Sequence, residues 1–85
     1  MPSVIMRAGA ELTFETLVAD RAPLRRRAEE TLIRVLDGAV RLTVDGRERL
    51  LRIGDEAIVP AGATHSLAGA GGAARLVSGS RPARG

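Results

Sequence analysis

The 85-residue chain contains no cysteine, lysine, tyrosine, tryptophan, asparagine or glutamine, and it has a single phenylalanine, Phe14, and a single histidine, His65. The lack of cysteine excludes disulfide bonds, thiolate catalysis and cysteine-based zinc sites. The near absence of aromatic side chains removes the stacking platforms with which proteins bind single-stranded nucleic acids and RNA. These absences predict that the protein has no nucleic-acid partner.

The basic charge of the chain comes from arginine alone. Thirteen arginines stand against ten acidic residues, for a net charge of +3. The sequence pI is nevertheless about 11.3, because no lysine, tyrosine or cysteine titrates between the histidine and the guanidinium groups. The pI therefore overstates the basicity, and the charge does not by itself indicate an acidic polymer as partner.

The length allows one domain with a small hydrophobic core. No apolar run approaches the roughly 18 residues that a membrane-spanning helix needs. The N-terminal segment, Met-Pro-Ser-Val-Ile-Met-Arg, lacks the apolar stretch and cleavage site of a secretory signal. We therefore expect a single cytoplasmic domain over residues 1–85 that does not bind membranes.

The C-terminal half of the sequence has the pattern of short β-strands. Apolar Val40, Leu42 and Val44 alternate with polar residues, as in a strand with one buried face. Asp45-Gly46 then predicts a tight type I′ hairpin turn, followed by a returning strand over 47–53. Further short strands are expected at 57–59, 64–67 and 74–78.

Residues 24–36 have two competing interpretations. Leu24, Ala28 and Leu32 fall at helical spacing among good helix formers, so local propensity favours a helix. The β-branched Thr31, Ile33 and Val35 precede an Asp-Gly turn and a clear strand, so a hairpin competes with that helix.

The segment from Gly54 to His65 reads Gly-Asp-Glu-Ala-Ile-Val-Pro-Ala-Gly-Ala-Thr-His. It resembles the second conserved motif of the cupin superfamily, in which Gly is followed after five residues by Pro-x-Gly and after two more by His. Residues 32–38 and the hairpin after them resemble the end of the first cupin motif. The resemblance covers residues 32 to about 78. It implies an all-β fold, a small cupin-type, jelly-roll-like barrel or sandwich, and it overrides the helix at 24–36.

The resemblance also implies the limits of the domain. We expect one cupin domain over 1–85, with its core at about 31–79 and a frayed tail at 80–85. Small cupins commonly form dimers through edge strands, so a homodimer is expected as well.

The first cupin motif is degenerate in this chain. In metal-binding cupins it supplies two His and a Glu, which join the second-motif His around a transition metal. Counting back from the last glycine of the motif puts Thr31 at the Glu position and residues 24–27 at the His positions. A frame shifted by one restores only Glu30. No metal or other cofactor is therefore expected; the alternative is a weak, open divalent-metal site of His65 with Glu30 or Glu29.

Three consecutive arginines stand where the histidines are missing. Such a run is ordinarily a solvated face, here balanced by the two glutamates that follow. At the mouth of a barrel, guanidinium groups could instead bind a carboxylate or phosphate, and strand alternation would direct Arg25 and Arg27 to one side and Arg26 to the other. We predict that His65, Arg25, Arg27 and Glu30 bind a small anionic molecule.

His65 has a second and a third interpretation. It could be a structural residue inside the barrel, or it could be catalytic. A neutral imidazole could transfer a proton in a metal-free isomerase or cyclase, and a non-standard metal site would suit an oxygenase. The sequence leaves open whether the protein is an enzyme and which small molecule it binds.

Overall fold

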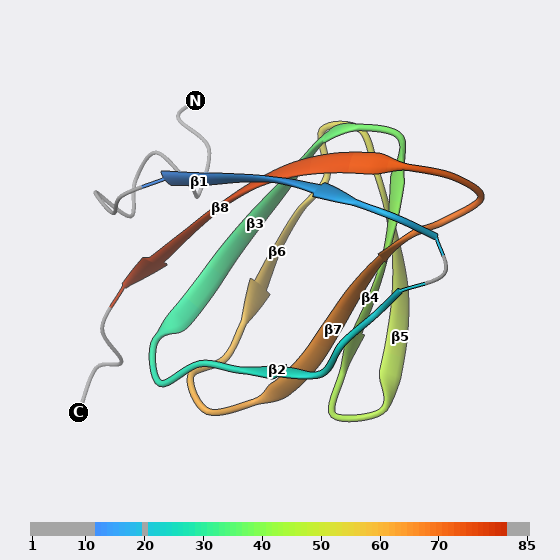
Figure 1. Cartoon of the computed structure of the whole chain (residues 1–85). Helices are drawn as coiled ribbons and strands as arrows, with labels where there is room; N and C mark the ends of the chain where they lie inside the picture. Colours follow the sequence, from blue (N-terminus) through green and yellow to red (C-terminus); the bar gives the residue numbers. More distant parts are fainter. Residues whose placement is uncertain (1–11, 20, 82–85) are drawn as a thin grey trace.

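The computed structural model describes residues 12–19 and 21–81, which fold into two antiparallel sheets of four strands each (Figure 1). One sheet has the order β1-β8-β3-β6 and the other the order β2-β7-β4-β5. The strands are β1 (Leu12–Leu17), β2 (Arg25–Arg26), β3 (Glu30–Asp37), β4 (Ala39–Val44), β5 (Arg47–Arg52), β6 (Glu56–Val59), β7 (Thr64–Gly69) and β8 (Ala74–Arg81). The architecture is all-β and jelly-roll-like, as the sequence predicts. Within these ranges no helix is long and apolar enough to cross a membrane.

The β4–β5 hairpin forms where the Asp45-Gly46 dipeptide predicts it. Asp45 has φ 48° and Gly46 has φ 84°, the two positive values that a type I′ turn requires. The turn sets the register in which Val44 pairs with Arg47 and Val40 with Leu51. Val40 and Leu51 thereby face the interior together, where both are buried.

The local helical pattern of residues 24–36 is overridden by tertiary pairing. This segment forms β2, a short bend and β3, and β3 is hydrogen-bonded to β8 on one side and β6 on the other. A helix would have needed Leu24 on its buried stripe, but Leu24 is 77% exposed. In the strand, Ile33 and Val35 alternate into the core instead, so the burial of β-branched side chains decides the structure.

The ordered structure extends beyond the part that resembles cupins in sequence. Strand β1 pairs with β8 along its whole length, from Leu12 opposite Gly79 to Leu17 opposite Ala74, and Leu17 lies in the core. Strand β8 continues to Arg81, two residues into the segment expected to fray. The rest of that tail, residues 82–85, lies outside the described residues, as does the N-terminal part of the expected domain, residues 1–11.

The apolar core lies between the two sheets. Its larger members come from both sheets, and most are less than 3% exposed. They are Leu17, Ile33, Val35, Val40, Leu42, Leu51, Val59, Leu67 and Leu76. Toward the start of β3 and β7 and the end of β8, in the lower part of Figure 1, polar side chains join the apolar Val59 and Val44 at the inward positions.

Candidate functional site

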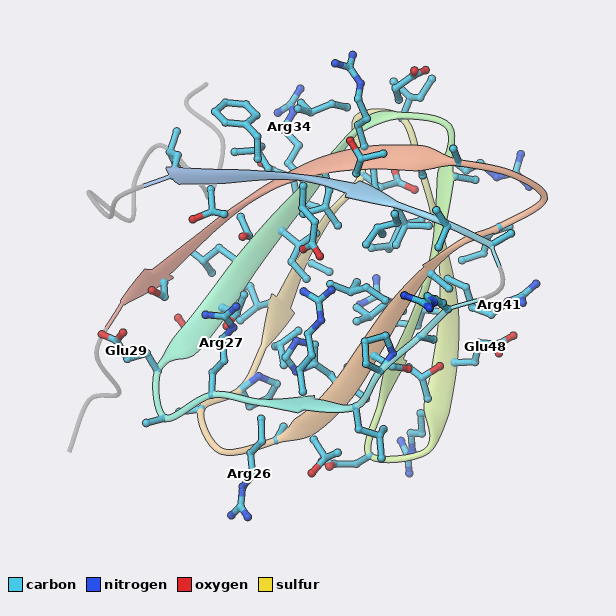
Figure 2. All side chains as sticks on the ribbon, viewed as in Figure 1. Arg26, Arg27, Glu29, Arg34, Arg41 and Glu48 are labelled. Atoms are coloured by element: carbon cyan, nitrogen blue, oxygen red, sulfur yellow. The ribbon has the colours of Figure 1, made fainter. Side chains whose placement is uncertain are left out.

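The polar end of the interior is organised by the pairing of β2 with β7. Arg25 stands directly opposite His65, so the two side chains share one face of the sheet. His65 is 2% exposed. Arg26 alternates to the outside, where its Nε donates a hydrogen bond of 3.1 Å to the carbonyl oxygen of Gly62. Figure 2 shows Arg26 pointing away from the barrel and Arg27 reaching into the space between the sheets.

Arg25 forms an ion pair with Glu15 that joins the two sheets. Its Nη1 and Nη2 donate to the two carboxylate oxygens of Glu15 at 2.8 and 2.5 Å, a bidentate, fork-to-fork arrangement. The hydrogen bond from Arg25 lowers the pKa of Glu15, against the opposing effect of burial, and Glu15 in turn raises the pKa of Arg25. The charge of Arg25 is therefore neutralised within the protein.

Glu15 is a site residue that the sequence analysis missed. It lies before residues 32–78, on which the sequence analysis based the resemblance, and charged residues in a strand are ordinarily placed on the solvated face. The available signal is the alternation of Thr13, Glu15 and Leu17, since Leu17 is buried in the core and shares its face with Glu15.

His65 is held in its neutral form. Burial is the main cause that lowers its pKa, and the positive charges of Arg25 and Arg27 act in the same direction. The backbone of Ala63 and the carboxylate of Glu15 oppose the shift without reversing it. The Nδ1 atom of His65 is buried and has no hydrogen-bond partner among the described residues.

A small polar cavity of about 40 Å³, which we call the hydroxyl hollow, lies at the same end of the sandwich. Arg27 and four hydroxyl-bearing residues of β1, β3 and β8 line it. Thr31 is 6% exposed, and its Oγ1 is buried without a hydrogen-bond partner among the described residues. The lining residues are Thr13, Arg27, Thr31, Ser78, Gly79 and Ser80.

The structure does not bring the predicted glutamates together with His65. Thr31 and Ile33 face the interior, so alternation places Glu30 on the opposite face of β3. Glu29 is exposed, and its Oε1 accepts a hydrogen bond of 3.5 Å from the hydroxyl of Ser80, which lines the hydroxyl hollow. Of the predicted ligand-binding residues, the structure groups Arg25, Arg27 and His65 and leaves Glu30 apart.

The side chains at this end do not fit the metal site of the superfamily. The pairing of β2 with β7 places arginines, not imidazoles, beside His65, and the Glu position of the first motif is occupied by Thr31. Always-charged guanidinium groups repel a cation. Across residues 12–19 and 21–81, no group of three or more His, Asp or Glu is placed to hold a metal ion. The donor set suits an anion better than a cation.

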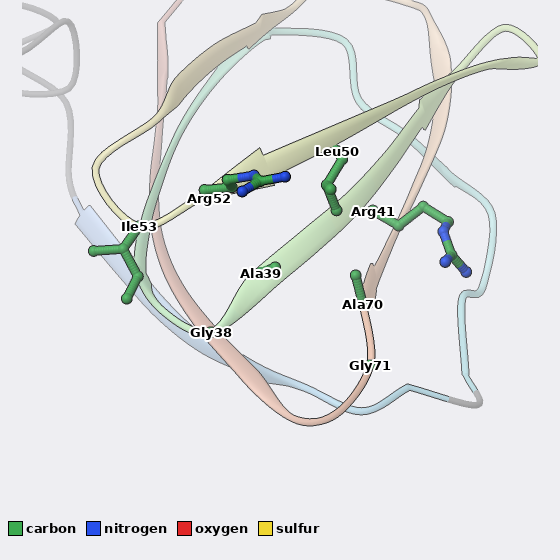
Figure 3. A pocket seen from close by; sticks show the side chains of 8 residues that line it. All are labelled: Gly38, Ala39, Arg41, Leu50, Arg52, Ile53, Ala70 and Gly71. Carbon is green, nitrogen blue, oxygen red and sulfur yellow. The ribbon is translucent and has the colours of Figure 1, made fainter.

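A wider hollow of about 560 Å³ lies elsewhere, on the outer face of the β4–β5 hairpin (Figure 3). Arg41, Leu50 and Arg52 line it from strand positions that point away from the core, and Gly38 closes one end. A Cβ atom on Gly38 would come within 2.7 Å of the carbonyl oxygen of Ala73, so this position requires glycine. None of the predicted site residues lies in this hollow.

The comparison with protein families agrees with this architecture. The model of the cupin domain matches residues 12–78, most of the chain and all of the strands except the end of β8. The chain belongs to the cupin family. No curated protein matches this cupin.

Several solved structures share the cupin fold with this chain. A cupin protein from Bacteroides fragilis has 19% sequence identity and a TM-score of 0.75, over 87% of this chain and 66% of its own. A protein from Neisseria meningitidis has 21% identity and a TM-score of 0.76, over 95% and 82% of the two chains. Hydroxypropylphosphonic acid epoxidase from S. wedmorenis, solved with fosfomycin, has 20% identity and a TM-score of 0.75, over 81% and 42%.

These likenesses concern the fold. At about 20% identity, a common fold does not imply common side chains in the site. This cupin also spans 42% of the epoxidase and 66% of the Bacteroides protein. What the site does must therefore be argued from its own residues.

Proposed function

We propose that this cupin binds a small anion at the polar end of its barrel, through Arg27 and with His65 beside it, and that it does so without the metal of the superfamily. The observation that carries the proposal is the environment of Arg27. Arg27 lines the hydroxyl hollow, and none of the ion pairs among the described residues includes it. A guanidinium beside a polar, partly enclosed cavity is a preferred binding group for carboxylates, phosphates and related anions.

The other charged groups at this end are less suited than Arg27 to bind an anion. Arg25 is neutralised by Glu15 within the barrel, and His65 is neutral because burial lowers its pKa. Glu29 at the rim is the opposing charge, but it is solvent-exposed and therefore screened. One structure that shares the fold, hydroxypropylphosphonic acid epoxidase, was solved in complex with fosfomycin.

The proposal is tested by titrating the ¹⁵N-labelled protein with acetate, malonate, methanesulfonate and phosphate, while the imidazole resonances of His65 are followed by NMR. NMR suits this chain because it lacks tryptophan and tyrosine for fluorescence. Arg27→Met keeps the aliphatic stem and should abolish the His65 response. Arg26→Met, the matched control one residue away, should retain it. An equal response of both variants, or the absence of binding by every anion, would refute the proposal.

A second candidate function is proton transfer by His65 within the same site. Two observations favour it: the lowered pKa of His65 and its buried Nδ1 without a hydrogen-bond partner. A neutral imidazole of this kind can accept a proton from a bound molecule, the step that a metal-free isomerase or cyclase needs. Incubation of small hydroxy and oxo acids in D₂O should then show protein-dependent C–H exchange by ¹H NMR. His65→Gln should abolish the exchange and leave anion binding in place.

The predicted homodimer stays a prediction. Leu50 and Ile53, which are 51% and 65% exposed beside the hollow of Figure 3, would be covered in a dimer formed through this face. Sedimentation velocity at micromolar concentration should give twice the monomer mass, and Leu50→Glu should give the monomer. A wild-type monomer would exclude the dimer under these conditions.

A further inference from the structure

The polar end of the barrel offers two anion-binding arrangements of different geometry. In the first, Arg25 holds the carboxylate of Glu15 by two parallel hydrogen bonds, the arrangement that a planar carboxylate favours. In the second, Arg27 faces a cavity lined by hydroxyl groups. The arrangement that favours a planar carboxylate is therefore already occupied by the carboxylate of Glu15.

The hydroxyl groups of the second arrangement come from several directions. Thr13 lies on β1 opposite Ser78 on β8, and Thr31 on β3 lies opposite Ser80 on β8, so three adjacent strands contribute. Arg27 follows β2, which belongs to the other sheet. Donors therefore approach the hydroxyl hollow from both layers of the sandwich.

The hydroxyl group of Thr31 is buried and finds no hydrogen-bond partner among the described residues. A buried hydroxyl without a hydrogen-bond partner destabilises the folded state, and valine has the same shape without that group. A threonine here gains its partner when an acceptor enters the cavity. An anion can supply acceptor oxygens but no donors, which matches a lining of hydroxyl hydrogens and a guanidinium.

We propose that the hydroxyl hollow is a subsite for a tetrahedral oxyanion group, the sulfonate, phosphonate or phosphate head of a small ligand. This inference rests on the proposed anion-binding function and names its ligand class. A tetrahedral head directs three oxygens to different sides, toward Arg27, Thr31 and the two serines. Ser80 would then donate to the head in place of Glu29, to which its hydroxyl donates at 3.5 Å. A planar carboxylate has two oxygens in one plane and leaves part of this lining without an acceptor.

The volume of the cavity limits what enters. About 40 Å³ is roughly three times the minimum of about 10–15 Å³ that a cavity needs to hold one water molecule. The subsite thus takes only the charged head. The remainder of the ligand extends outward past Arg27, which is exposed to solvent.

The test compares two monoanions that differ in geometry, methanesulfonate and acetate, by NMR titration of the intact protein. We expect methanesulfonate to bind at least about ten-fold more tightly, because hydrogen bonds to a charged group contribute substantially. Thr31→Val should weaken methanesulfonate about ten-fold and change acetate little. Thr43→Val, on the outward face of β4, is the matched control and should change neither.

Stability provides an independent readout for the same variant. Because Thr31→Val removes an unpartnered buried hydroxyl, the ligand-free variant should unfold in urea at the same concentration as wild type or higher. Ser80→Ala, a smaller change in the same lining, should also weaken methanesulfonate binding. It serves as the test if Thr31→Val does not fold.

The outcomes separate this inference from the proposed function. Equal binding of acetate and methanesulfonate, both abolished by Arg27→Met, would overturn the tetrahedral subsite and leave the anion-binding function intact. Binding of neither anion, together with malonate and phosphate, would overturn both. Unchanged methanesulfonate binding in Thr31→Val and Ser80→Ala would show that the hydroxyl groups hold water only, and would overturn the subsite.

Discussion

The two ends of the barrel interior share strands β1, β3, β7 and β8 and differ in the polarity of the side chains that these strands direct inward. Along β8 the inward side chains change from Ala74 and Leu76 to Ser78 and Ser80, while β1 changes from Leu17 to Glu15 and Thr13. The first half packs into an apolar core, and the second half surrounds an ion pair, a buried imidazole and a cavity. The period-two alternation is uninterrupted across this change.

This comparison shows how a domain of 85 residues can carry both a core and a site. A small chain buries limited apolar surface, so each inward position given to a polar group reduces the stabilisation from the hydrophobic effect. In this cupin the Arg25–Glu15 pair joins the sheets where apolar packing ends. The stability that the polar end contributes should therefore depend on charge and pH. The stability that the apolar end contributes should depend on the volume of its buried side chains.

The largest effect is expected from a cavity at the apolar end. Leu42 is 1% exposed and lies in the core between the two sheets, so Leu42→Ala should lower the free energy of unfolding by about 2–5 kcal/mol. Urea unfolding followed by far-ultraviolet circular dichroism measures the change. Leu50→Ala, on the exposed face of β5, is the matched control and should cost less than about 1 kcal/mol. Equal losses would show that the core is not where the structure places it.

The second largest effect on the free energy of unfolding is expected from the Arg25–Glu15 ion pair. Its two side chains are 22% and 30% exposed, so solvent screening reduces its contribution below that of a fully buried pair. Arg25→Met and Glu15→Gln should each lower the free energy of unfolding by about 1–2 kcal/mol, and the double variant should lose less than their sum. Strict additivity in this cycle would mean that the two residues do not interact.

The pH dependence of stability tests the polar end of the barrel without changing the volume of any side chain. The pKa of His65 is lowered in the folded state, so the unfolded chain binds more protons as pH falls through its ordinary value of 6.5, and stability should decrease there. His65→Gln should remove this decrease in circular-dichroism melts. A further loss is expected below pH 4.5, where the lowered pKa of Glu15 favours the folded state only while the carboxylate is charged. A flat profile between pH 7 and 5 in the wild type would contradict the placement of His65.

The smallest effect is expected at the rim. Glu29→Gln removes a negative charge beside the hydroxyl hollow and should tighten methanesulfonate binding by less than about five-fold, since the carboxylate is exposed. NMR titration measures the change, and the effect should shrink in added salt. Glu48→Gln, which removes an exposed charge beside Arg41 on the other sheet, should leave the affinity unchanged.

Much of the fold was predictable from particular residues. The alternation over 40–44 and the Asp45-Gly46 turn are local signals, and each acts through backbone conformation or the pleat of one strand. Residues 24–36 show the limit of such signals. Their helical spacing is real, but pairing with β6 and β8 buries Ile33 and Val35 more completely than a lone helix could.

The site was predictable only in part, because local signals give the direction of a side chain but not its neighbours from distant strands. Alternation separates Arg25 from Arg26 on opposite faces of β2, because the direction of a side chain in a strand depends on its own backbone; Arg27 follows the strand. The sequence also singled out His65 through the spacing of its motif. It could not find Glu15, Ser78 or Ser80, because their role depends on which strands become neighbours.

The sequence by itself determined the all-β class, the hairpin, the motif that places His65 inward and the absence of the residues that a cupin metal site needs. Only the tertiary structure decided that Glu15 neutralises Arg25, that Glu30 lies apart from His65, and that four hydroxyl groups meet Arg27 around one cavity. The physical reason is that turns and alternation are properties of a few consecutive residues. Charge compensation and cavities arise between strands that are distant in the chain and are brought together by burial of the common core.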